Sequence, residues 1–488
     1  MANNGRKLAV WVKNAVACGV VLVIAGCAVR TPPPPQIPPT ATVPNDWVVE
    51  SRSAVAATSA TTDWIASFGD PQLDSIVAEA MANNLDLRMA DAGLQIAAQL
   101  ARKAGAALYP WVSVNASASG LGGYEPDTAS NRSGISLDVS WEIDLWGRIR
   151  AGKASAGADF RAASADYEFA RLSLAGQTAK AWFQTVESKL QVRLSESAVD
   201  LYRRNLQLAE VRFTAGLVSE LDSHMAEFQL ATEEEFLRQA RNGYEQGVRA
   251  LEVLLGRYPA AELETVDMLV AVPPPVAAGI PAQVLERRPD LVAAEERLAA
   301  AFHSIQVAEA ARLPSITLTG STGSASSELR DTFGAPNPFW SLAAGLLAPI
   351  FQAGNLQANV EIANAEQEAA VANYGQSALQ AFSEVETALA QEDYLREALE
   401  FQEVAVREAT AAARQASIQY DVGLIDFLSV IQIQDALVSA QSGLLSLENM
   451  RLANRVNLHL ALGGDYGARA PGQPVSGTDA GTDLPSKR

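Results

Sequence analysis

Gly147, Gly152 and Lys153 stand at the spacing G-x-x-x-x-G-K, within the stretch DLWGRIRAGKAS. This spacing is typical of the start of a phosphate-binding loop, in which backbone N–H groups and a lysine hold nucleotide phosphates. The loop needs Ser or Thr after the lysine to bind Mg²⁺, but the next residue here is Ala154. The competing interpretation is structural: a strand-like run precedes Gly147 and a helical run follows it, so the glycines serve the transition between them.

Few other residues could carry out catalysis. The three histidines, His224, His303 and His459, are scattered and have no metal-ligand spacing, and no G-x-S-x-G motif occurs. We therefore expect no enzymatic activity, no metal and no resident cofactor. Detectable nucleotide binding would revive the enzyme hypothesis.

The N-terminus predicts export and lipidation. A basic head precedes an apolar run of about a dozen residues, which is shorter than the ~20 that a membrane-spanning helix needs. The run ends at Ile24-Ala25-Gly26-Cys27, which resembles a bacterial lipobox. We predict a signal peptide over 1–26 and a covalent lipid (palmitate) on Cys27; the alternative is an ordinary signal peptide and an unmodified cysteine. Ala28 after the cysteine favours the outer membrane.

Composition also defines both ends of the mature chain. A Pro-rich stretch predicts an extended, lipid-anchored linker over 27–62, and Gly, Pro, Ser and Thr predict a disordered tail over 465–488. The net charge is −19 and becomes −22 once Arg6, Lys7 and Lys13 leave with the signal, which argues against a nucleic-acid partner.

The chain repeats itself. Asp86 corresponds to Asp290 and Tyr109 to Leu313, each 204 residues apart, and Phe213 corresponds to Tyr420, 207 residues apart. We predict two repeats of one architecture, over 63–258 and 259–464. The counterpart of the opening stretch is PIFQAGNLQANV, which keeps Gly354 but has no G-x-x-x-x-G-K spacing. The repeat therefore favours the structural interpretation of the opening motif.

Each repeat has the pattern of two strands, a long helix, a tight turn and a second long helix. We predict strands at about 109–122, 133–146, 314–325 and 339–352. The clearest one alternates strictly: its apolar face runs from Ile135 to Leu145, and its polar face carries Asp138, Glu142 and Asp144. In a membrane barrel the apolar face contacts lipid and the acids line the lumen, where they favour cations. The alternative is that the acids form the solvated face of a soluble sheet.

The helical windows are unusually long. Residues from about Gly147 to Arg212 predict a helix of about 65 residues, or about 100 Å. Apolar residues recur every seven positions from Leu230 to Leu251, which indicates a coiled-coil seam. The helices suit either a surface-exposed bundle or a shaft that spans a compartment. Four strands are too few to close a barrel, since known membrane barrels begin at eight, so membrane-spanning strands must be pooled by several chains.

The chain resembles the TolC-like outer-membrane factors, in the NodT-type lipoprotein branch. The motifs that carry the resemblance run from Trp64 to Gly464 and read WIASFGDPQLDSIVAEAMANNLDL, WEIDLWGR, LERRPDLVAAE and PIFQAG. The resemblance implies a mainly α fold with a membrane β-barrel part: a homotrimer in which each chain gives four strands to one 12-stranded barrel on a long α-helical periplasmic tunnel. It also implies a periplasmic adaptor and an inner-membrane pump as partners, outer-membrane lipid around the barrel, and a role as the exit duct of an efflux or secretion system. A non-channel, coiled-coil structural lipoprotein of the envelope is the alternative, although it has no use for the alternating strands.

The helix-reversing turns 214–218 and 421–425 each contain a glycine, Gly216 and Gly423. The resemblance assigns these turns to the periplasmic gate and to contact with the adaptor. Asp222 and Tyr420 match two gate positions, and we expect a hydrogen bond between them; the alternative is that Asp222 caps a helix. Other family positions differ, with Ser429 and Gln432 where the best-known relative has Asp, and Ile425 where it has Arg. Closure is then expected to depend on packing of Phe427, Leu428 and Ile431.

Overall fold

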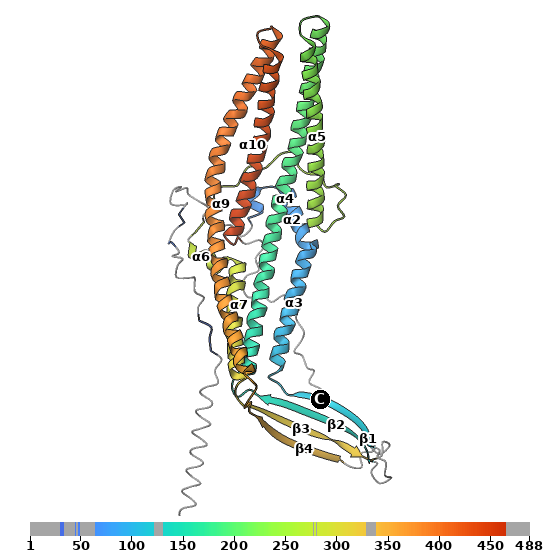
Figure 1. Cartoon of the computed structure of the whole chain (residues 1–488), viewed down its shortest axis with the longest axis vertical. Coiled ribbons are helices and arrows are strands. Elements are labelled where there is room, and N and C mark those ends of the chain that lie inside the picture. Colours follow the sequence, from blue (N-terminus) through green and yellow to red (C-terminus); the bar gives the residue numbers. More distant parts are fainter. Residues whose placement is uncertain are drawn as a thin grey trace, which may run out of the picture. The chain divides into compact units, whose positions relative to one another are not determined.

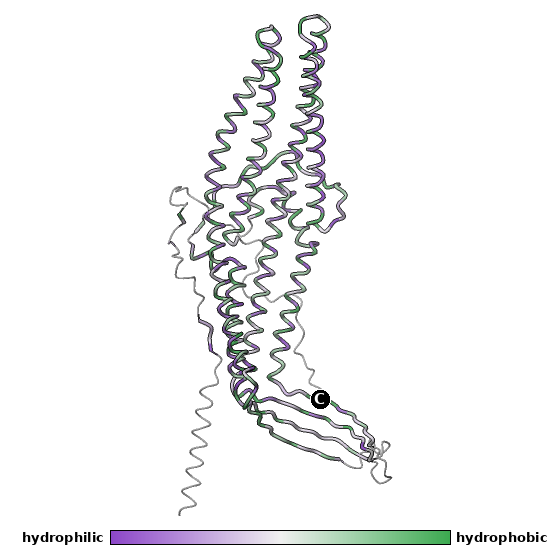
Figure 2. Tube along the Cα trace, in the orientation of Figure 1, coloured by the Kyte–Doolittle hydropathy of each residue, from purple (hydrophilic) through white to green (hydrophobic). Residues whose placement is uncertain are grey.

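The computed structural model describes residues 30–33, 44, 47–48, 64–121, 130–276, 278–279, 281–327 and 338–464. The predicted signal peptide, Cys27, most of the linker over 27–62 and the tail over 465–488 lie outside the described residues. Among the helices that are described, none combines the length and apolar character needed to cross a membrane. Figure 2 shows the reason: hydrophobic and hydrophilic residues are interleaved along the long helices.

The two halves of the chain form the same elements in the same order (Figure 1). The first half contains α2 (Pro71–Asn83), α3 (Leu85–Ala106), β1 (Trp111–Leu121), β2 (Ser130–Ile143), α4 (Arg148–Thr214) and α5 (Glu220–Leu254). The second half contains α6 (Pro281–Arg287), α7 (Pro289–Ala310), β3 (Ser315–Ser326), β4 (Pro338–Leu347), α9 (Asn355–Asp421) and α10 (Phe427–Ala461). A short 3-10 helix, η2 (Ala66–Phe68), precedes α2.

Three pairs of equivalent helices agree in length to the residue. α3 and α7 have 22 residues each, α4 and α9 have 67 each, and α5 and α10 have 35 each. At about 1.5 Å per residue, α4 and α9 are each about 100 Å long, as the sequence predicts. The heptad seam of α5 is half-buried from Leu230 to Tyr244 and fully buried at Leu251, as a coiled-coil contact requires.

The compact units of the structure are not the sequence repeats. One unit contains Asp91–Tyr167 and Asp290–Ala378, and therefore all four strands; the other contains Thr42–Ala90, Glu168–Pro289 and the chain from Leu379 onward. Each unit draws on both repeats. The two copies are thus packed against each other within each unit, and neither repeat is a compact unit by itself.

The strands form one antiparallel sheet in the order β1-β2-β3-β4. β1 and β3 agree with the predicted strands, but β2 and β4 end earlier than predicted, at Ile143 and Leu347 instead of about 146 and 352. After β2, the Leu145 N–H donates a hydrogen bond to the Ile143 carbonyl at 2.8 Å instead of to a neighbouring strand. After β4, Pro349 has no N–H that could continue the strand pairing. Asp144 is therefore outside the strand on which its role was predicted.

The opening glycine motif has a structural role. Gly147 and its counterpart Gly354 have φ values of 79° and 84°, which L side chains rarely adopt, and each lies immediately before a 67-residue helix. α4 already begins at Arg148, so Gly152 and Lys153 belong to a helix, and Lys153 is exposed. In a phosphate loop the segment between the two glycines is a loop that leads into the helix, whereas here residues 148–151 are already helical. The nucleotide-binding interpretation is therefore wrong, and the strand-to-helix interpretation is confirmed.

Glu252 holds the connection that follows α5. Its side chain is buried, and its carboxylate accepts hydrogen bonds from the backbone N–H groups of Ala261, Glu262 and Leu263 at 2.7, 2.8 and 3.1 Å. Burial alone would raise the pKa of Glu252, but these three donors outweigh it and lower the pKa. They also hold Ala261 at a φ of 60°, a conformation that is strained for a residue with a Cβ atom.

We predict that Glu252→Gln destabilises the protein by about 1–3 kcal/mol, because an amide replaces the charged acceptor of three backbone donors. The wild-type contribution is present above the carboxyl's ordinary pKa and is lost as the pH falls through the lowered, folded value. The difference in thermal midpoint between wild type and variant should therefore shrink on acidification. Glu245→Gln, on the exposed side of the same helix, removes only an ion pair with Arg249 and should change the midpoint little. Equal effects of the two variants would contradict this account.

Candidate functional site

The turns between the long helices are built in the same way in both repeats. Gly216 and Gly423 have φ values of 71° and 77°. Around them, the Leu217 N–H donates to the Arg212 carbonyl at 2.9 Å, and the Leu424 N–H donates to the Gln419 carbonyl at 2.8 Å. This is the Schellman helix ending, which places glycine at the left-handed position. The two predicted turn glycines are therefore confirmed as the residues that allow the chain to reverse.

An apolar cluster lies just inside the turns. Four helices contribute its buried members, which are Ala209 of α4, Ala226 of α5, Tyr420 of α9, and Phe427, Val430 and Ile431 of α10. Phe427 and Ile431 are thus buried within the chain, and their predicted role in closure of the gate stays a prediction. Leu428 is 48% exposed and is not among the residues of this cluster. The role predicted for Leu428 in closure of the gate stays a prediction.

The expected hydrogen bond between Asp222 and Tyr420 is not formed. The Tyr420 hydroxyl is buried and has no hydrogen-bond partner among the described residues, and burial raises its pKa. Asp222 lies in the first turn of α5, where its carboxylate accepts from the Ser219 hydroxyl and its N–H donates to the Ser219 carbonyl, both at 3.2 Å. The alternative prediction was that Asp222 caps a helix; the cap residue of α5 is Ser219, and Asp222 is an acid of the first turn, where a negative charge is favourable.

Arg212, which the sequence analysis did not single out, joins the two turns. Its guanidinium donates to the carbonyls of Tyr420 and Asp421 at 3.0 and 3.1 Å, and it lies 4.3 Å from the centre of the Tyr420 ring. It also forms an ion pair with the Asp421 carboxylate at 3.3 Å. A cation at the C-terminus of a helix satisfies carbonyls that have no partner in the helix. The signal in the sequence was a basic residue in the last turn before Gly216.

Exposed apolar side chains surround this polar contact at the surface of the turns. Leu217, Val422 and Leu424 are 73%, 66% and 73% exposed. Leu217 and Leu424 are the equivalent residues of the two repeats. The end of the helical part of the chain thus presents matched apolar residues on a frame held by Arg212, which is a surface suited to contact with another protein.

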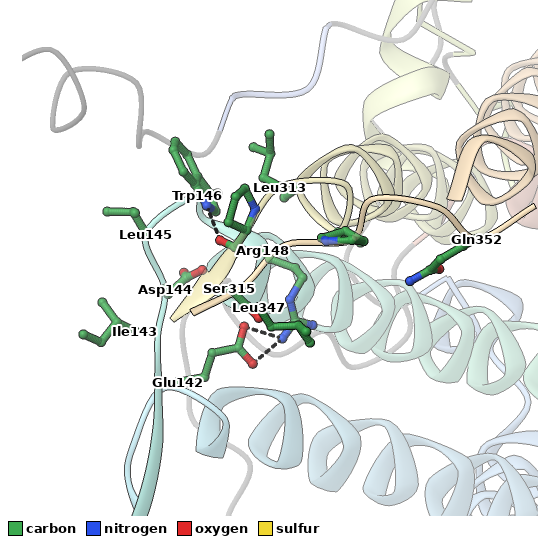
Figure 3. A pocket seen from close by; sticks show the side chains of 14 residues that line it. Glu142, Ile143, Asp144, Leu145, Trp146, Arg148, Leu313, Ser315, Leu347 and Gln352 are labelled. Carbon is green, nitrogen blue, oxygen red and sulfur yellow. Dashed lines mark hydrogen bonds and ion pairs between the residues drawn. The ribbon is translucent and has the colours of Figure 1, made fainter. Parts of the chain in front are cut away.

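The three acids predicted for the barrel lumen are all engaged within the chain. Asp138 accepts from the hydroxyls of Ser136 and Ser321 at 3.0 and 2.5 Å. Glu142 accepts two hydrogen bonds at 2.8 Å from Arg148 (Figure 3). Asp144 receives the backbone N–H groups of Ile149 and Arg150 at 3.0 Å each, at the start of α4. Asp144 is therefore a helix cap and not a strand residue; burial alone would raise its pKa, but these donors and the Arg150 side chain lower it.

The residues between β2 and α4 line a cavity of about 280 Å³ (Figure 3). Glu142 and Arg148 lie on it beside Leu313 and Leu347, and the Trp146 ring N–H donates to the Pro314 carbonyl at 2.6 Å. This last contact joins the first repeat to the second. Within the described part of the chain, no group of three or more His, Cys, Asp or Glu side chains could hold a metal ion.

Comparison with solved structures identifies the class of this fold. The outer-membrane channel OprN matches with a TM-score of 0.82 and 29% sequence identity, over 91% of this chain and 99% of that chain. A crystal structure of CusC matches with a TM-score of 0.77 and 28% identity, over 89% and 99% of the two chains. One strand hairpin followed by two long helices, built twice in one chain, is thus the fold that this chain shares with outer-membrane channels.

The family follows from the sequence comparisons. A family model described as outer membrane efflux protein matches residues 76–257 and 280–464. The pyoverdine export outer membrane protein OpmQ of Pseudomonas putida is 33% identical over 92% of this chain and 97% of its own length, and the cation efflux system protein CusC of Escherichia coli is 29% identical over 92% and 97%. The chain belongs to the outer membrane efflux protein family, and it is an outer-membrane exit channel of a tripartite efflux system.

We predict that Arg212→Ala loosens the turn at the end of α9. Loss of two hydrogen bonds to helix carbonyls and of the contact with the Tyr420 ring should cost about 1–2 kcal/mol, which corresponds to roughly tenfold faster amide hydrogen exchange over residues 418–424. Arg203→Ala on the same helix removes only exposed ion pairs with Asp200 and Glu234 and should leave that segment unchanged. Unchanged exchange in the Arg212 variant would show that the turn does not depend on this contact.

Proposed function

We propose that three copies of this chain close one 12-stranded barrel in the outer membrane and continue into a shared helical tunnel in the periplasm. The observation that carries the proposal is the open four-stranded sheet. Its outer strands, β1 and β4, have no second neighbour among the described strands. In lipid, the unpaired N–H and C=O groups of such edges are costly, and closure into a barrel is the arrangement that removes them.

The lengths and side chains of the strands support a position in the membrane. The four strands have 11, 14, 12 and 10 residues, and a tilted membrane strand needs about 9–11. Large apolar side chains are exposed on both edge strands in the isolated chain. They include Trp111, Val112 and Val114 on β1, and Trp340, Leu342, Leu346 and Leu347 on β4, with exposed fractions from 54% to 81%. A soluble sheet would not tolerate this surface, whereas lipid and neighbouring strands cover it.

The turns 214–218 and 421–425 are proposed as the periplasmic entrance and as the surface that meets the adaptor, which in turn connects to the inner-membrane pump. The exposed Leu217, Val422 and Leu424 support this role.

Cys27 is proposed to carry the lipid that anchors the chain to the outer membrane, with no resident cofactor required. The relatives are named for pyoverdine export, cation efflux and toluene efflux, so membership of the family leaves the substrate open.

The barrel predicts that β1 of one copy pairs with β4 of the next. Val114→Cys, combined in turn with Trp340→Cys, Leu342→Cys or Leu346→Cys, allows for an unknown stagger between the strands. Under oxidation, at least one combination should give covalent species of two and three chains and none larger. Each single variant can give dimers at most. A product ladder that extends beyond three chains, or no product from any combination, would contradict closure by these edges.

The proposed entrance predicts that loosening the turns raises conductance. Arg212→Ala should increase the single-channel conductance of the purified protein in planar bilayers severalfold, because it frees the turn that follows α9. Asp222→Ala is the matched control, since this carboxylate bonds only Ser219 in the same turn region and should leave the conductance near the wild-type value. The assignment of the turns as the entrance would be wrong if both variants conducted like wild type.

A further inference from the structure

A buried polar cluster joins α4, α5 and α10, one helical turn further along α10 than Ile431. Tyr202 of α4 donates to the Asp435 carboxylate of α10 at 2.5 Å, and the Gln229 side-chain amide of α5 donates to the same carboxylate at 2.8 Å. Glu233 lies one turn beyond Gln229 on the same face of α5. Glu233 is 6% exposed and Tyr202 is 1% exposed. The cluster therefore brings two carboxyl groups, one from each repeat, into a site that is shielded from water.

The duplicated fold does not explain this cluster. At an offset of 207 residues, the positions equivalent to Tyr202, Gln229, Glu233 and Asp435 are all apolar: Ala409, Ala436, Ala440 and Phe228. The equivalent helices nevertheless have the same lengths, so the helical frame forms without these polar groups in one of its two copies. Burying a carboxyl group costs free energy that burying an alanine does not. The cluster is therefore a feature of one contact, between α5 and α10 with α4 beside them, and the architecture does not require it.

The two carboxyl groups are not neutralised by a cation. Among the described residues, no Lys, Arg or His side chain forms an ion pair with Glu233 or Asp435. The neighbouring charged side chains of α4 and α5 pair on the exposed side: Arg203 with Asp200 and Glu234, and Glu196 with Arg241. Burial raises the pKa of Glu233, the charge of Asp435 raises it further, and a hydrogen bond with Ser195 of α4 offsets part of the effect. Tyr202 is the other titratable group here, and burial and Asp435 raise its pKa, so its hydroxyl stays a donor.

We propose that a proton on Glu233 holds α5 against α10, so that this contact between the two repeats tightens in acid and loosens as the pH rises. With the proton in place, one negative charge remains in the cluster, and the hydrogen bonds from Tyr202 and Gln229 satisfy it. Without it, two carboxylates repel each other where little water screens them. The contact then weakens, because its donors already bind Asp435 and leave the new charge on Glu233 poorly satisfied.

The raised pKa of Glu233 gives the direction of the effect. Its stabilising contribution is fully present below the ordinary pKa of a glutamate and is lost as the pH rises through the raised, folded value. Acid therefore strengthens this contact, whereas it weakens the one at Glu252. Both α5 and α10 begin directly after the turns 214–218 and 421–425, so a weaker contact between them loosens the turns. This consequence for the passage of solutes rests on the periplasmic entrance proposed above.

Amide hydrogen exchange of the full-length protein in detergent tests the contact, over residues 226–236 and 430–440 and from about pH 4.5 to about pH 8. Protection factors of wild type should fall severalfold as the pH rises. Glu233→Gln keeps the shape but cannot ionise, so its protection should stay near the acid value throughout. Glu234→Gln is the matched control, since it removes only an exposed pair with Arg203 and should keep the wild-type profile. Asp435→Asn still accepts from Tyr202 and Gln229 but removes the facing charge, so the transition should move to lower pH.

The outcomes separate this inference from the proposed entrance. A Glu233→Gln profile that still follows wild type with pH, or wild-type protection that does not change with pH, would show that the inference is wrong. A merely structural role of Glu233 would change protection by the same factor at every pH, and this result would also overturn it. If exchange behaves as expected but the single-channel conductances of wild type and Glu233→Gln keep a constant ratio over the same pH range, the proton-dependent contact stands and the entrance is wrongly assigned.

Discussion

The unpaired backbone groups along β1 and β4 constrain this molecule more than any other feature. A sheet of four strands has two open edges, and lipid offers no water to hydrogen-bond the N–H and C=O groups along them. The chain contributes strands of suitable length and apolar surface but too few of them for a barrel. In the proposed barrel, other copies of the chain therefore supply the remaining strands.

The internal duplication is also visible in how the two repeats pack against each other. Inside the chain the first repeat already meets the second, through Trp146 and Pro314 and through the packing of α4 on α7. The two repeats also use glycine at the same places. Gly147 and Gly354 lie just before the two long helices, Gly216 and Gly423 lie in the turns that follow them, and all four have positive φ.

Much of this architecture could be predicted from the sequence, because it depends on local patterns. Strict alternation from Ile135 onward predicted β2, the heptad seam from Leu230 to Leu251 predicted a coiled coil, and the offsets of 204 and 207 predicted equivalent halves. The end of β2 and the role of Asp144 were predicted wrongly, because a hydrogen bond to the backbone outweighed the alternating sequence pattern. Asp144 continues the alternation in the sequence, but its carboxylate caps α4 and the strand ends before it. The role of Arg212 depends on carbonyls that are 208 and 209 residues away in the chain, and no local pattern reports such a distance.

The mass of the wild-type protein after extraction in detergent, corrected for bound detergent, tests the central claim most directly. The account predicts three chains in each particle, because four strands from each copy are then enough to close one barrel. A stable monomer would contradict it, since a single open sheet of four strands cannot remain in lipid with both edges unpaired.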